Sequence, residues 1–366
     1  MTRPDYIIVG PDPRRTDIAN PGGQLTATTG LLQYAHETGV KLAFVDTLQG
    51  SFPVPPLGVR VARAARRQLQ MLGYATLCRP RKGVLIFAAG PGSFLDRAVS
   101  GFIAQLFGLK TIMCLRSGHL IPFLGGSSTL GRVISALVRF QPRVLVQGQY
   151  WLPNLERAGV DPARTRVVAN WLALNKPLAA QPRNAPVERE VCFVFVGWLV
   201  AEKGLRELHE ACEHLVASGD DFHLKIVGGG TLQDELINRF STSGLQKRVT
   251  TTGWVDPSDV AVHIDDADVF VVPTYLEGFP NALIEAFAHG LPAISTPVGA
   301  IPDSLVDGKN GFLVAPRNAL QLADAMRRYI RNPELIAQHS AEAIATTRDK
   351  HDFRTNCARL FEAVED

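Results

Sequence analysis

The sequence has no long hydrophobic run. No uninterrupted apolar stretch reaches the roughly 18 residues of a membrane-spanning helix, so we expect no segment that crosses a bilayer. The first residues run directly into a short apolar segment. They show neither a long apolar signal segment nor a cleavage-site pattern. These absences predict a cytoplasmic protein.

Cysteine is scarce, and its distribution excludes two classes of protein. A disulfide framework needs paired cysteines, and a zinc site needs closely spaced ligands. The five cysteines are odd in number, widely scattered and mostly embedded in apolar segments, at Cys78, Cys114, Cys192, Cys212 and Cys357. We therefore predict reduced cysteines in the core.

An excess of charge of one sign is also missing. Lys and Arg number 38 and Asp and Glu 35, and the formal net charge of +3 is too small to predict a nucleic-acid partner. One basic stretch stands out, V-R-V-A-R-A-A-R-R at residues 59–67, and apolar residues continue it at helical spacing. It fits either an ordinary solvated helix face or a helix on an anionic membrane surface. The sequence therefore leaves open a peripheral contact with the inner face of a membrane.

What the sequence does contain is the composition of a globular protein, with 46% hydrophobic and 20% charged residues. A chain of 366 residues is long enough for two domains. Short apolar runs alternate with longer segments of helical period, which is typical of parallel sheets with crossover helices. In the first half we expect strands at Tyr6–Val9, Lys41–Val45, Val84–Ala88, Thr111–Leu115, Val144–Val146 and Arg166–Val168.

A break in composition at residues 174–190, where proline is frequent and apolar residues are few, predicts a linker. A second series of strands follows, at Cys192–Val196, His223–Val227, Val249–Thr252, Val269–Val272, Pro292–Ser295 and Phe312–Val314. From Asn318 the pattern is helical to the end. We therefore predict an α/β fold of two doubly wound, Rossmann-like domains that face a cleft. Their expected bounds are 1–175 for the first domain, 176–190 for the linker, 191–345 for the second domain, and 346–366 for a last helix that can pack back on the first.

The segment V-F-V-V-P-T-Y-L-E-G-F-P-N-A-L-I-E, which ends at Glu285, reads as a buried strand, a loop and the start of a helix. Ligands of open parallel sheets bind beyond the carboxyl ends of the strands, where this loop lies. Gly278 lets a ligand approach the backbone, and the amides from Gly278 to Asn281 favour an anion at a helix start. Glu285 has the chemistry to accept hydrogen bonds from ribose hydroxyls. The alternative is that Glu277 and Glu285 are solvated acids of a loop and a helix surface.

Two further strand–loop–helix junctions contain glycine. In V-G-W-L-V-A-E-K-G-L, Gly197 permits close approach and Lys203 can meet phosphate, although a turn lysine near a helix start is the simpler alternative. In I-V-G-G-G-T-L, the run Gly228, Gly229 and Gly230 leaves room for a base or a ribose. A glycine turn without a ligand is the competing interpretation there, and the run does not fit the G-x-G-x-x-G fingerprint.

The first half offers a weaker set of candidates. Gly22 and Gly23 precede an expected helix, where backbone amides can cradle a phosphate or admit an acceptor. Arg116 and His119 follow the strand ending in Cys114-Leu115, on the side expected to face the cleft. Either side chain can contact a sugar or its phosphates, and a surface or structural role for a lone loop histidine stays open.

Asp266 and Asp268 spell the D-x-D pattern that some transferases use to hold a divalent metal. The pair stands immediately before an expected strand, which is the wrong end of the sheet for a ligand. We assign these residues to helix termination and strand entry, and we expect no metal or other cofactor.

Taken together, these segments resemble the family-4 retaining glycosyltransferases, group 1, of GT-B architecture. The resemblance is strongest in the second half, through V-G-W-L-V-A-E-K-G, I-V-G-G-G, T-G-W-V, the segment ending at Glu285, V-G-A-I-P-D and D-G-K-N-G-F-L-V. In the first half it rests on Gly22-Gly23 and V-V-A-N-W.

The resemblance implies a role for each matching residue. Glu277 would lie beside the donor sugar, Glu285 would bind the ribose hydroxyls and Lys203 would hold the diphosphate. Backbone amides would contact the sugar and the distal phosphate from Gly278, Phe279, Pro280 and Asn281. Gly197 and Gly228 to Gly230 would border the nucleotide, and Gly22 and Gly23 would approach the phosphates from the other domain. Arg116 and His119 complete the expected catalytic set with Glu277 and Lys203.

The implied activity is retaining transfer of a sugar from a UDP- or GDP-sugar to a hydroxyl of a glycan or lipid-linked acceptor, in polysaccharide or glycoconjugate biosynthesis. Two departures from the pattern bear on it: Trp198 stands where the family commonly has a phosphate-binding arginine, and Arg116 stands where it often has histidine. Arg116 as a substitute cation, a weakened donor site and an unusual donor all remain open. The alternative function is a catalytically silent GT-B protein that binds a nucleotide sugar or a partner protein.

Overall fold

The computed structural model of the chain describes residues 3–15, 23–47, 55–186 and 189–365. It divides into two compact units, one made of residues 1–174 and 352–366 and the other of residues 175–351. Among the described residues, no helix is both long enough and apolar enough to cross a membrane.

The first unit contains a six-stranded sheet in which every strand pairs in parallel with its neighbours, in the order β2-β1-β3-β4-β5-β6. The strands are β1 (Tyr6–Gly10), β2 (Leu42–Asp46), β3 (Gly83–Ala88), β4 (Thr111–Leu115), β5 (Val144–Val146) and β6 (Thr165–Val167). Both faces of this sheet are covered by helices, which is why β1, β3 and β4 are continuous apolar runs and do not alternate with polar residues.

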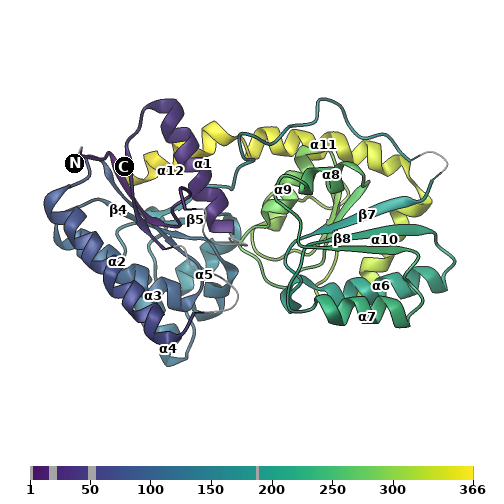
Figure 1. Cartoon of the computed structure of the whole chain (residues 1–366), viewed down its shortest axis with the longest axis horizontal. Helices are drawn as coiled ribbons and strands as arrows, with labels where there is room; N and C mark the ends of the chain where they lie inside the picture. The colour runs from purple at the N-terminus through teal and green to yellow at the C-terminus, as the bar shows by residue number, and fades with distance from the viewer. Residues whose placement is uncertain (1–2, 16–22, 48–54, 187–188, 366) are drawn as a thin grey trace. The chain divides into compact units, whose positions relative to one another are not determined.

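Successive residues of one strand supply two separate cores. Ile7 and Val9 of β1 point into a core with Met71, while Tyr6 and Ile8 point into the other. The first core lies under α2 (Leu57–Leu77), α3 (Pro91–Leu106) and α4 (Thr129–Arg139), and α5 (Leu152–Arg157) also contributes to it. The second lies under α1 (Gly23–Thr38) and α12 (Phe353–Glu365), so the last helix of the chain is part of the first unit (Figure 1).

The second unit repeats the plan with the parallel order β12-β11-β10-β7-β8-β9. Its strands are β7 (Val191–Val196), β8 (Phe222–Val227), β9 (Val249–Gly253), β10 (Val269–Val272), β11 (Ala293–Ser295) and β12 (Gly311–Leu313). The predicted fold class of two doubly wound α/β domains is therefore confirmed.

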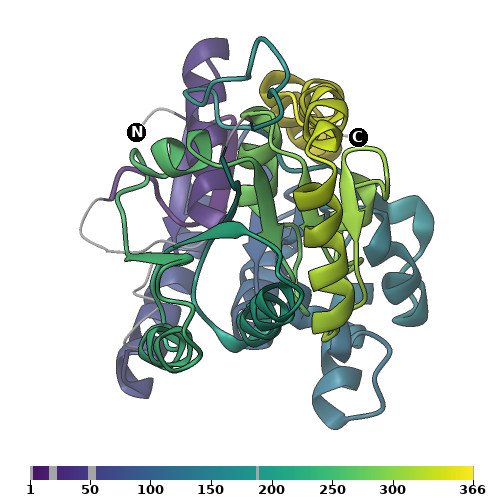
Figure 2. The ribbon, with the colours of Figure 1, turned by 90° about the vertical axis from the view of Figure 1, so that its right-hand side faces the viewer.

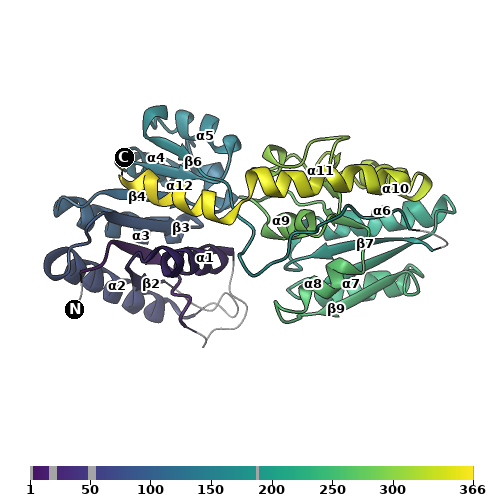
Figure 3. The same ribbon diagram turned by 90° about the horizontal axis from the view of Figure 1, so that it is seen from above.

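Helices again cover both faces of the second sheet. They are α6 (Leu205–Ala217), α7 (Gln233–Thr242), α8 (Val260–Asp265), α9 (Asn281–Ala288), α10 (Ala319–Arg331) and α11 (Glu334–Lys350). Figure 2 shows α10 beside α6, and Figure 3 shows α9 beside α11, in agreement with their packing contacts. The short helix α9 matters most for the site, because it begins where the loop after β10 ends.

Candidate functional site

The loop at residues 273–280 joins the carboxyl end of β10 to the start of α9. Pro280 occupies the position before the helix and Asn281 is its first residue, as the sequence pattern indicated. Proline suits a helix start because its fixed φ costs little there and its missing N–H is not needed. The loop therefore lies at the end of the sheet where ligands of doubly wound folds bind.

One side of this loop is fixed to the turn that ends at Lys203, the 3₁₀ helix η4 (Ala201–Lys203). The carbonyl of Glu202 accepts hydrogen bonds from the Thr274 hydroxyl at 2.9 Å and from the Tyr275 amide at 2.7 Å. Gly204, at φ +71°, is so close to the loop that a Cβ atom there would lie 1.9 Å from the Pro273 carbonyl oxygen. The two segments are thus packed backbone against backbone.

The other side of the loop is fixed to the segment after β11. The amide of Ala300 donates to the carbonyl of Gly278 at 2.9 Å. Gly299, at φ +58°, would bring a Cβ atom within 2.4 Å of the Glu277 carbonyl oxygen. The backbone of Glu277 and Gly278 is consequently held in place without help from a ligand.

This packing brings together two residues that the sequence pattern singled out. The ammonium of Lys203 forms an ion pair with the carboxylate of Glu277. Both side chains are mostly shielded from solvent, with 21% of the Lys203 side chain and 12% of the Glu277 side chain exposed. A lysine in this position needs a counter-charge, and the neighbouring glutamate supplies it.

Glu285, on the first turns of α9, pairs with a residue that the sequence analysis missed. Its carboxylate lies 3.2 Å from the ammonium of Lys176, which also contacts the Pro257 carbonyl at 3.4 Å. Lys176 lies in the segment predicted as a linker, where a single lysine among prolines carries no signal. The structure therefore pairs each of the two predicted glutamates with a lysine.

The predicted glycine segments lie side by side. A Cβ atom on Gly228, at φ +133°, would lie 2.0 Å from the Gly197 carbonyl oxygen, and one on Gly230 would lie 2.5 Å from that of Leu199. The Leu199 amide in turn donates to the Gly229 carbonyl at 2.9 Å. These glycines are thus required by close backbone packing, and their contact with a nucleotide stays a prediction.

Trp198, in the place of the expected arginine, forms an aromatic pair with Trp254. The ring centroids are 5.1 Å apart and the planes meet at 84°, an edge-to-face arrangement. Trp254 follows β9 and also covers Gly229, where an added Cβ atom would lie 2.4 Å from the indole nitrogen. An apolar pair therefore occupies the position where the family pattern has a cation.

Phe279 and Pro280 are both buried. The Phe279 ring packs 5.3 Å from the imidazole of His351, so its side chain belongs to the interior. A contact of these two residues with a ligand would consequently be made by their backbone, as the resemblance implies.

In the first unit, Arg116 directly follows β4, and its amide donates to the Ala88 carbonyl at 2.9 Å. Its guanidinium lies 5.7 Å from the Phe87 ring and 5.8 Å from the Trp171 ring. Burial lowers the pKa of Arg116 to about 10, and one terminal nitrogen is buried without a hydrogen-bond partner. A buried donor of this kind is suited to a polar ligand atom.

The remaining candidates of the first unit are placed differently. His119 is exposed and lies in the 3₁₀ helix η1 (Gly118–Phe123), where its amide donates to the Ser117 hydroxyl at 3.4 Å. Gly23 is the exposed first residue of α1. Gly22 lies outside the described residues.

The D-x-D residues have structural partners. Asp268 accepts hydrogen bonds from Arg189 at 2.6 and 2.7 Å and from the Cys192 amide at 2.8 Å, and Asp266 pairs with Lys225 at 3.2 Å. Both aspartates stand before β10, at the end of the sheet opposite the loop at 273–280. In the described part of the chain, no group of three or more His, Cys, Asp or Glu residues is arranged to hold a metal ion.

Comparisons with known proteins point to one family. Residues 179–346 match the family model described as "Glycosyl transferases group 1". The chain is 30% identical over 226 residues to a Salmonella typhimurium protein named as a colanic acid biosynthesis glycosyltransferase, covering 58% of this chain and 55% of that protein. It is 28% identical over 200 residues to the glycogen synthase of Mycobacterium tuberculosis, covering 54% and 45%. The chain thus spans about half the length of the curated relatives it matches.

Solved structures agree over nearly the whole chain. Sucrose-phosphate synthase from Thermosynechococcus elongatus superposes with a TM-score of 0.77 at 19% identity, covering 98% of both chains. HepE from Anabaena, in complex with UDP-glucose, superposes with a TM-score of 0.73 at 21% identity and also covers 98% of both. These likenesses confirm the GT-B fold, and the family match confirms the resemblance to the group 1 glycosyltransferases.

Proposed function

Because residues 179–346 match the family model of the group 1 glycosyltransferases, we propose that this chain is a retaining glycosyltransferase of polysaccharide or glycoconjugate biosynthesis. It moves a sugar from a nucleoside-diphosphate sugar to a hydroxyl of a glycan or lipid-linked acceptor. The observation that carries the proposal is the fixed loop at 273–280, which holds Glu277 against Lys203 at the start of α9.

The donor binds to the second unit in this proposal. Glu285 accepts hydrogen bonds from the ribose hydroxyls, and Lys176 beside it orients that carboxylate. The backbone N–H groups of Gly278, Phe279 and Asn281 lie at the start of α9, where the helix dipole favours the distal phosphate. Glu277 lies beside the sugar. UDP- and GDP-sugars are the donors to test first.

The chemistry depends on the leaving group. As the bond between the anomeric carbon and the phosphate oxygen breaks, negative charge builds on the distal phosphate of the nucleoside diphosphate. Lys203 is fixed by its ion pair with Glu277, so its ammonium is positioned before that charge develops. Stabilisation that grows toward the transition state raises turnover more than it raises donor affinity. The acceptor hydroxyl then attacks from the face that the leaving group vacates and gives its proton to an oxygen of the departing phosphate. The anomeric configuration is thereby retained.

We propose that the reaction proceeds without a metal. Lys203 and the amides at the start of α9 supply the positive potential that a divalent cation would otherwise provide. Equal turnover before and after treatment with a chelator is the expected result. Loss of activity that added Mg²⁺ or Mn²⁺ restores would contradict it.

A peripheral membrane contact fits the surface of the first unit. Only Met71 and Ala75 of α2 are buried, so most of this 21-residue helix faces outward. Its exposed side chains are both apolar and basic, among them Leu57, Arg60, Val61, Arg63, Arg66, Leu69 and Leu77. We propose that this helix contacts anionic lipids on the inner face of a membrane, which would bring the enzyme to a lipid-linked acceptor.

A donor screen tests the central proposal. Thermal shifts with UDP-, GDP- and ADP-sugars, compared between the native protein and Glu285→Ala, identify the donor and its ribose contact together. The selected donor is then assayed for transfer and hydrolysis, and the anomeric proton of the product is examined by NMR. An inverted product would overturn the retaining mechanism.

One observation favours the silent alternative. The Trp198–Trp254 pair fills the position of a phosphate-binding cation with an apolar surface. Saturable donor binding with neither transfer nor hydrolysis, over a broad panel of glycan and lipid-linked acceptors, would support a binding protein and contradict the enzyme.

A further inference from the structure

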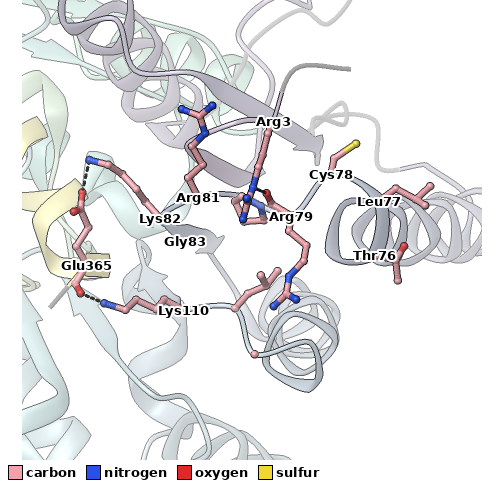
Figure 4. Close-up of a pocket in the computed structure, with 13 residues that line it drawn as sticks. Arg3, Thr76, Leu77, Cys78, Arg79, Arg81, Lys82, Gly83, Lys110 and Glu365 are labelled. Carbon is pink, nitrogen blue, oxygen red and sulfur yellow. Dashed lines mark hydrogen bonds and ion pairs between the residues drawn. The ribbon is translucent and has the colours of Figure 1, made fainter.

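The first unit carries a concentration of positive charge in one groove. A groove of about 750 Å³ is lined by Arg3, Arg79, Arg81, Lys82 and Lys110. The same lining contains one carboxylate, that of Glu365. Figure 4 shows these side chains around Gly83, the first residue of β3.

Composition does not account for this excess. Cations and anions nearly balance over the chain, 38 against 35, whereas among the described residues five cations line the groove beside one carboxylate. Like charges gathered in one concave place repel one another, and a bound anion relieves that repulsion. The groove is therefore a site of positive potential that favours an anionic ligand.

The order of the strands in the sheet explains why these cations lie in one groove. Arg81 and Lys82 directly precede β3, Lys110 directly precedes β4, and Arg3 lies shortly before β1. Because β1, β3 and β4 are parallel neighbours, these residues meet at the amino ends of the three strands. Ligands of this fold class normally bind at the carboxyl ends, so the groove lies at the opposite end of this sheet from the usual ligand position.

Contacts among the described residues use only part of the donor capacity in the groove. Arg79 donates to the Phe107 carbonyl at 2.7 Å, and Lys82 contacts the Glu365 carboxylate at 2.9 Å. Arg3 donates to the Arg79 carbonyl at 2.5 Å, and Lys110 contacts the backbone carbonyl of Glu365. Arg81 lies 3.8 Å from Asp5 and is largely exposed. Since an arginine carries five N–H donors and a lysine three, these contacts use fewer donors than the five cations carry.

Several arginine forks and lysine ammonium groups in one groove suit phosphate better than a single carboxylate. Phosphate presents three acceptor oxygens and binds arginine through two parallel hydrogen bonds. The groove is also within the size range of small-molecule sites, about 300–1,000 Å³. We propose that it is a binding site for a phosphate group, carried either by a soluble phosphate ester or by the headgroup of an anionic phospholipid.

Cys78 provides a local reporter, because it is a reduced cysteine that lines the same groove. The experiment measures the rate of its alkylation by N-ethylmaleimide, a neutral reagent, at constant ionic strength. One arm adds inorganic phosphate or glycerol phosphate. The other arm adds vesicles of phosphatidylglycerol, with phosphatidylcholine vesicles as the reference. We expect saturable slowing, at least threefold, in one arm or in both.

Matched variants separate the groove from other anion sites. Arg81→Gln with Lys110→Gln should weaken the apparent affinity at least fivefold, whereas Lys247→Gln with Arg348→Gln removes the same charge from exposed positions of the second unit and should not change it. Glu365→Gln should tighten binding, because its carboxylate competes for Lys82. Gln can still accept the hydrogen bond from the Tyr6 hydroxyl, so this variant should keep its fold.

The donor site is tested separately with Lys203→Gln. If phosphate or phosphatidylglycerol slows the alkylation of Cys78 in that variant as much as in the native protein, the result supports the phosphate site in the groove. That outcome does not depend on whether the enzyme transfers a sugar. Slowing by soluble phosphate assigns the site to a free ester, and slowing by phosphatidylglycerol alone assigns it to a lipid headgroup. The proposal is overturned if neither arm slows Cys78, if both charge-matched pairs have equal effects, or if Lys203→Gln abolishes the response.

Discussion

Lys203 and Glu277 form an ion pair between the turn after β7 and the loop after β10, with most of each side chain shielded from solvent. They are far apart in the sequence and come from strands that are neighbours in the sheet. The pair holds the lysine in position without an unbalanced charge in a shielded place. On the proposed mechanism, the diphosphate of the donor takes over part of the role that Glu277 plays in the absence of ligand.

Lys203→Gln should therefore lower kcat much more than it changes KM. Loss of one positioned group that stabilises developing charge typically costs about 10²–10³-fold in kcat. Steady-state kinetics with the donor found in the screen provides the measurement, and Lys203→Arg is the control that keeps the charge. Full turnover by Lys203→Gln would contradict the phosphate role of this lysine.

Glu285→Ala should act on donor affinity and leave turnover at saturation nearly unchanged. A hydrogen bond to a charged group contributes about 1.5–3 kcal/mol, so the Kd for the donor should rise roughly 10- to 100-fold. Lys176→Ala should weaken the donor less, because it removes only the partner 3.2 Å from this carboxylate. Isothermal titration with the intact donor and with its 2′-deoxy analogue checks both. If Glu285→Ala loses as much affinity for the 2′-deoxy analogue as for the intact donor, the assignment of Glu285 to the ribose hydroxyls is wrong.

The strands were the easiest feature to predict from the sequence, and the reason is physical. Strands covered on both faces consist of continuous apolar runs, such as Ile7 to Val9. These runs differ clearly from the spacing of apolar residues in amphipathic helices. All twelve predicted strands are present, each within one residue of its expected bounds. The loop at 273–280 was also foreseen, because its place after a buried strand and before a helix fixes it at one end of the sheet.

Side-chain partners could not be foreseen in the same way. Lys176 pairs with Glu285, which lies more than a hundred residues later in the sequence. Trp198 contacts Trp254 only because β7, β8 and β9 are adjacent in the sheet. The basic groove has the same origin, since sheet order brings Arg3 and Lys110 to the residues before β3. Pairings of this kind depend on which strands are neighbours, and a local pattern does not contain that information.

The thiols provide a test of the core. Burial raises the pKa of Cys114 to about 12 and that of Cys192 to about 11, and it raises the pKa values of Cys212 and Cys357 further. A raised thiol pKa means little thiolate, so these four should resist alkylation at pH 8 and Cys78 alone should react. Mass spectrometry of the labelled protein provides the measurement, and native Cys78→Ser should remain unlabelled. Rapid labelling of Cys114 without denaturant would show that the second core, under α1 and α12, is not closed.

The same shifts predict a change of stability with pH. An unfolded thiol ionises near pH 8.5, whereas these buried thiols keep their protons in the folded protein until about pH 11 or above. The folded state thus binds more protons in that interval, and stability should fall as the pH rises through it. Thermal unfolding between pH 7 and 10 measures the slope, and Cys192→Ser should reduce it. An unchanged slope in that variant would contradict the assignment.

The glycines next to Trp254 allow the packing of the candidate site to be tested by rescue. Alanine at Gly229 would place its Cβ atom 2.4 Å from the Trp254 indole nitrogen, whereas alanine at Gly228 would place it 2.0 Å from the Gly197 carbonyl oxygen. A half-exposed indole can move, but the backbone of Gly197 is fixed by its amide hydrogen bond to the Val227 carbonyl at 3.0 Å. Gly228→Ala should therefore lower Tm more than Gly229→Ala.

Trp254→Ala should rescue Gly229→Ala and leave Gly228→Ala unimproved, because only the first clash involves the indole. In a double-mutant cycle we expect a coupling of about 1 kcal/mol or more between Gly229 and Trp254. This corresponds to a Tm difference of roughly 2–4 °C for a unit of this size.

Gly219→Ala is the control for a glycine with positive φ, since Gly219 has φ +73° but no heavy atom within 4 Å of the added Cβ position. Its cost measures the left-handed backbone conformation alone, about 1–2 kcal/mol. Gly228→Ala should cost more, because its Cβ atom would also meet the Gly197 carbonyl oxygen, and a cost no greater than that of Gly219→Ala would contradict the close packing of Gly197 against Gly228.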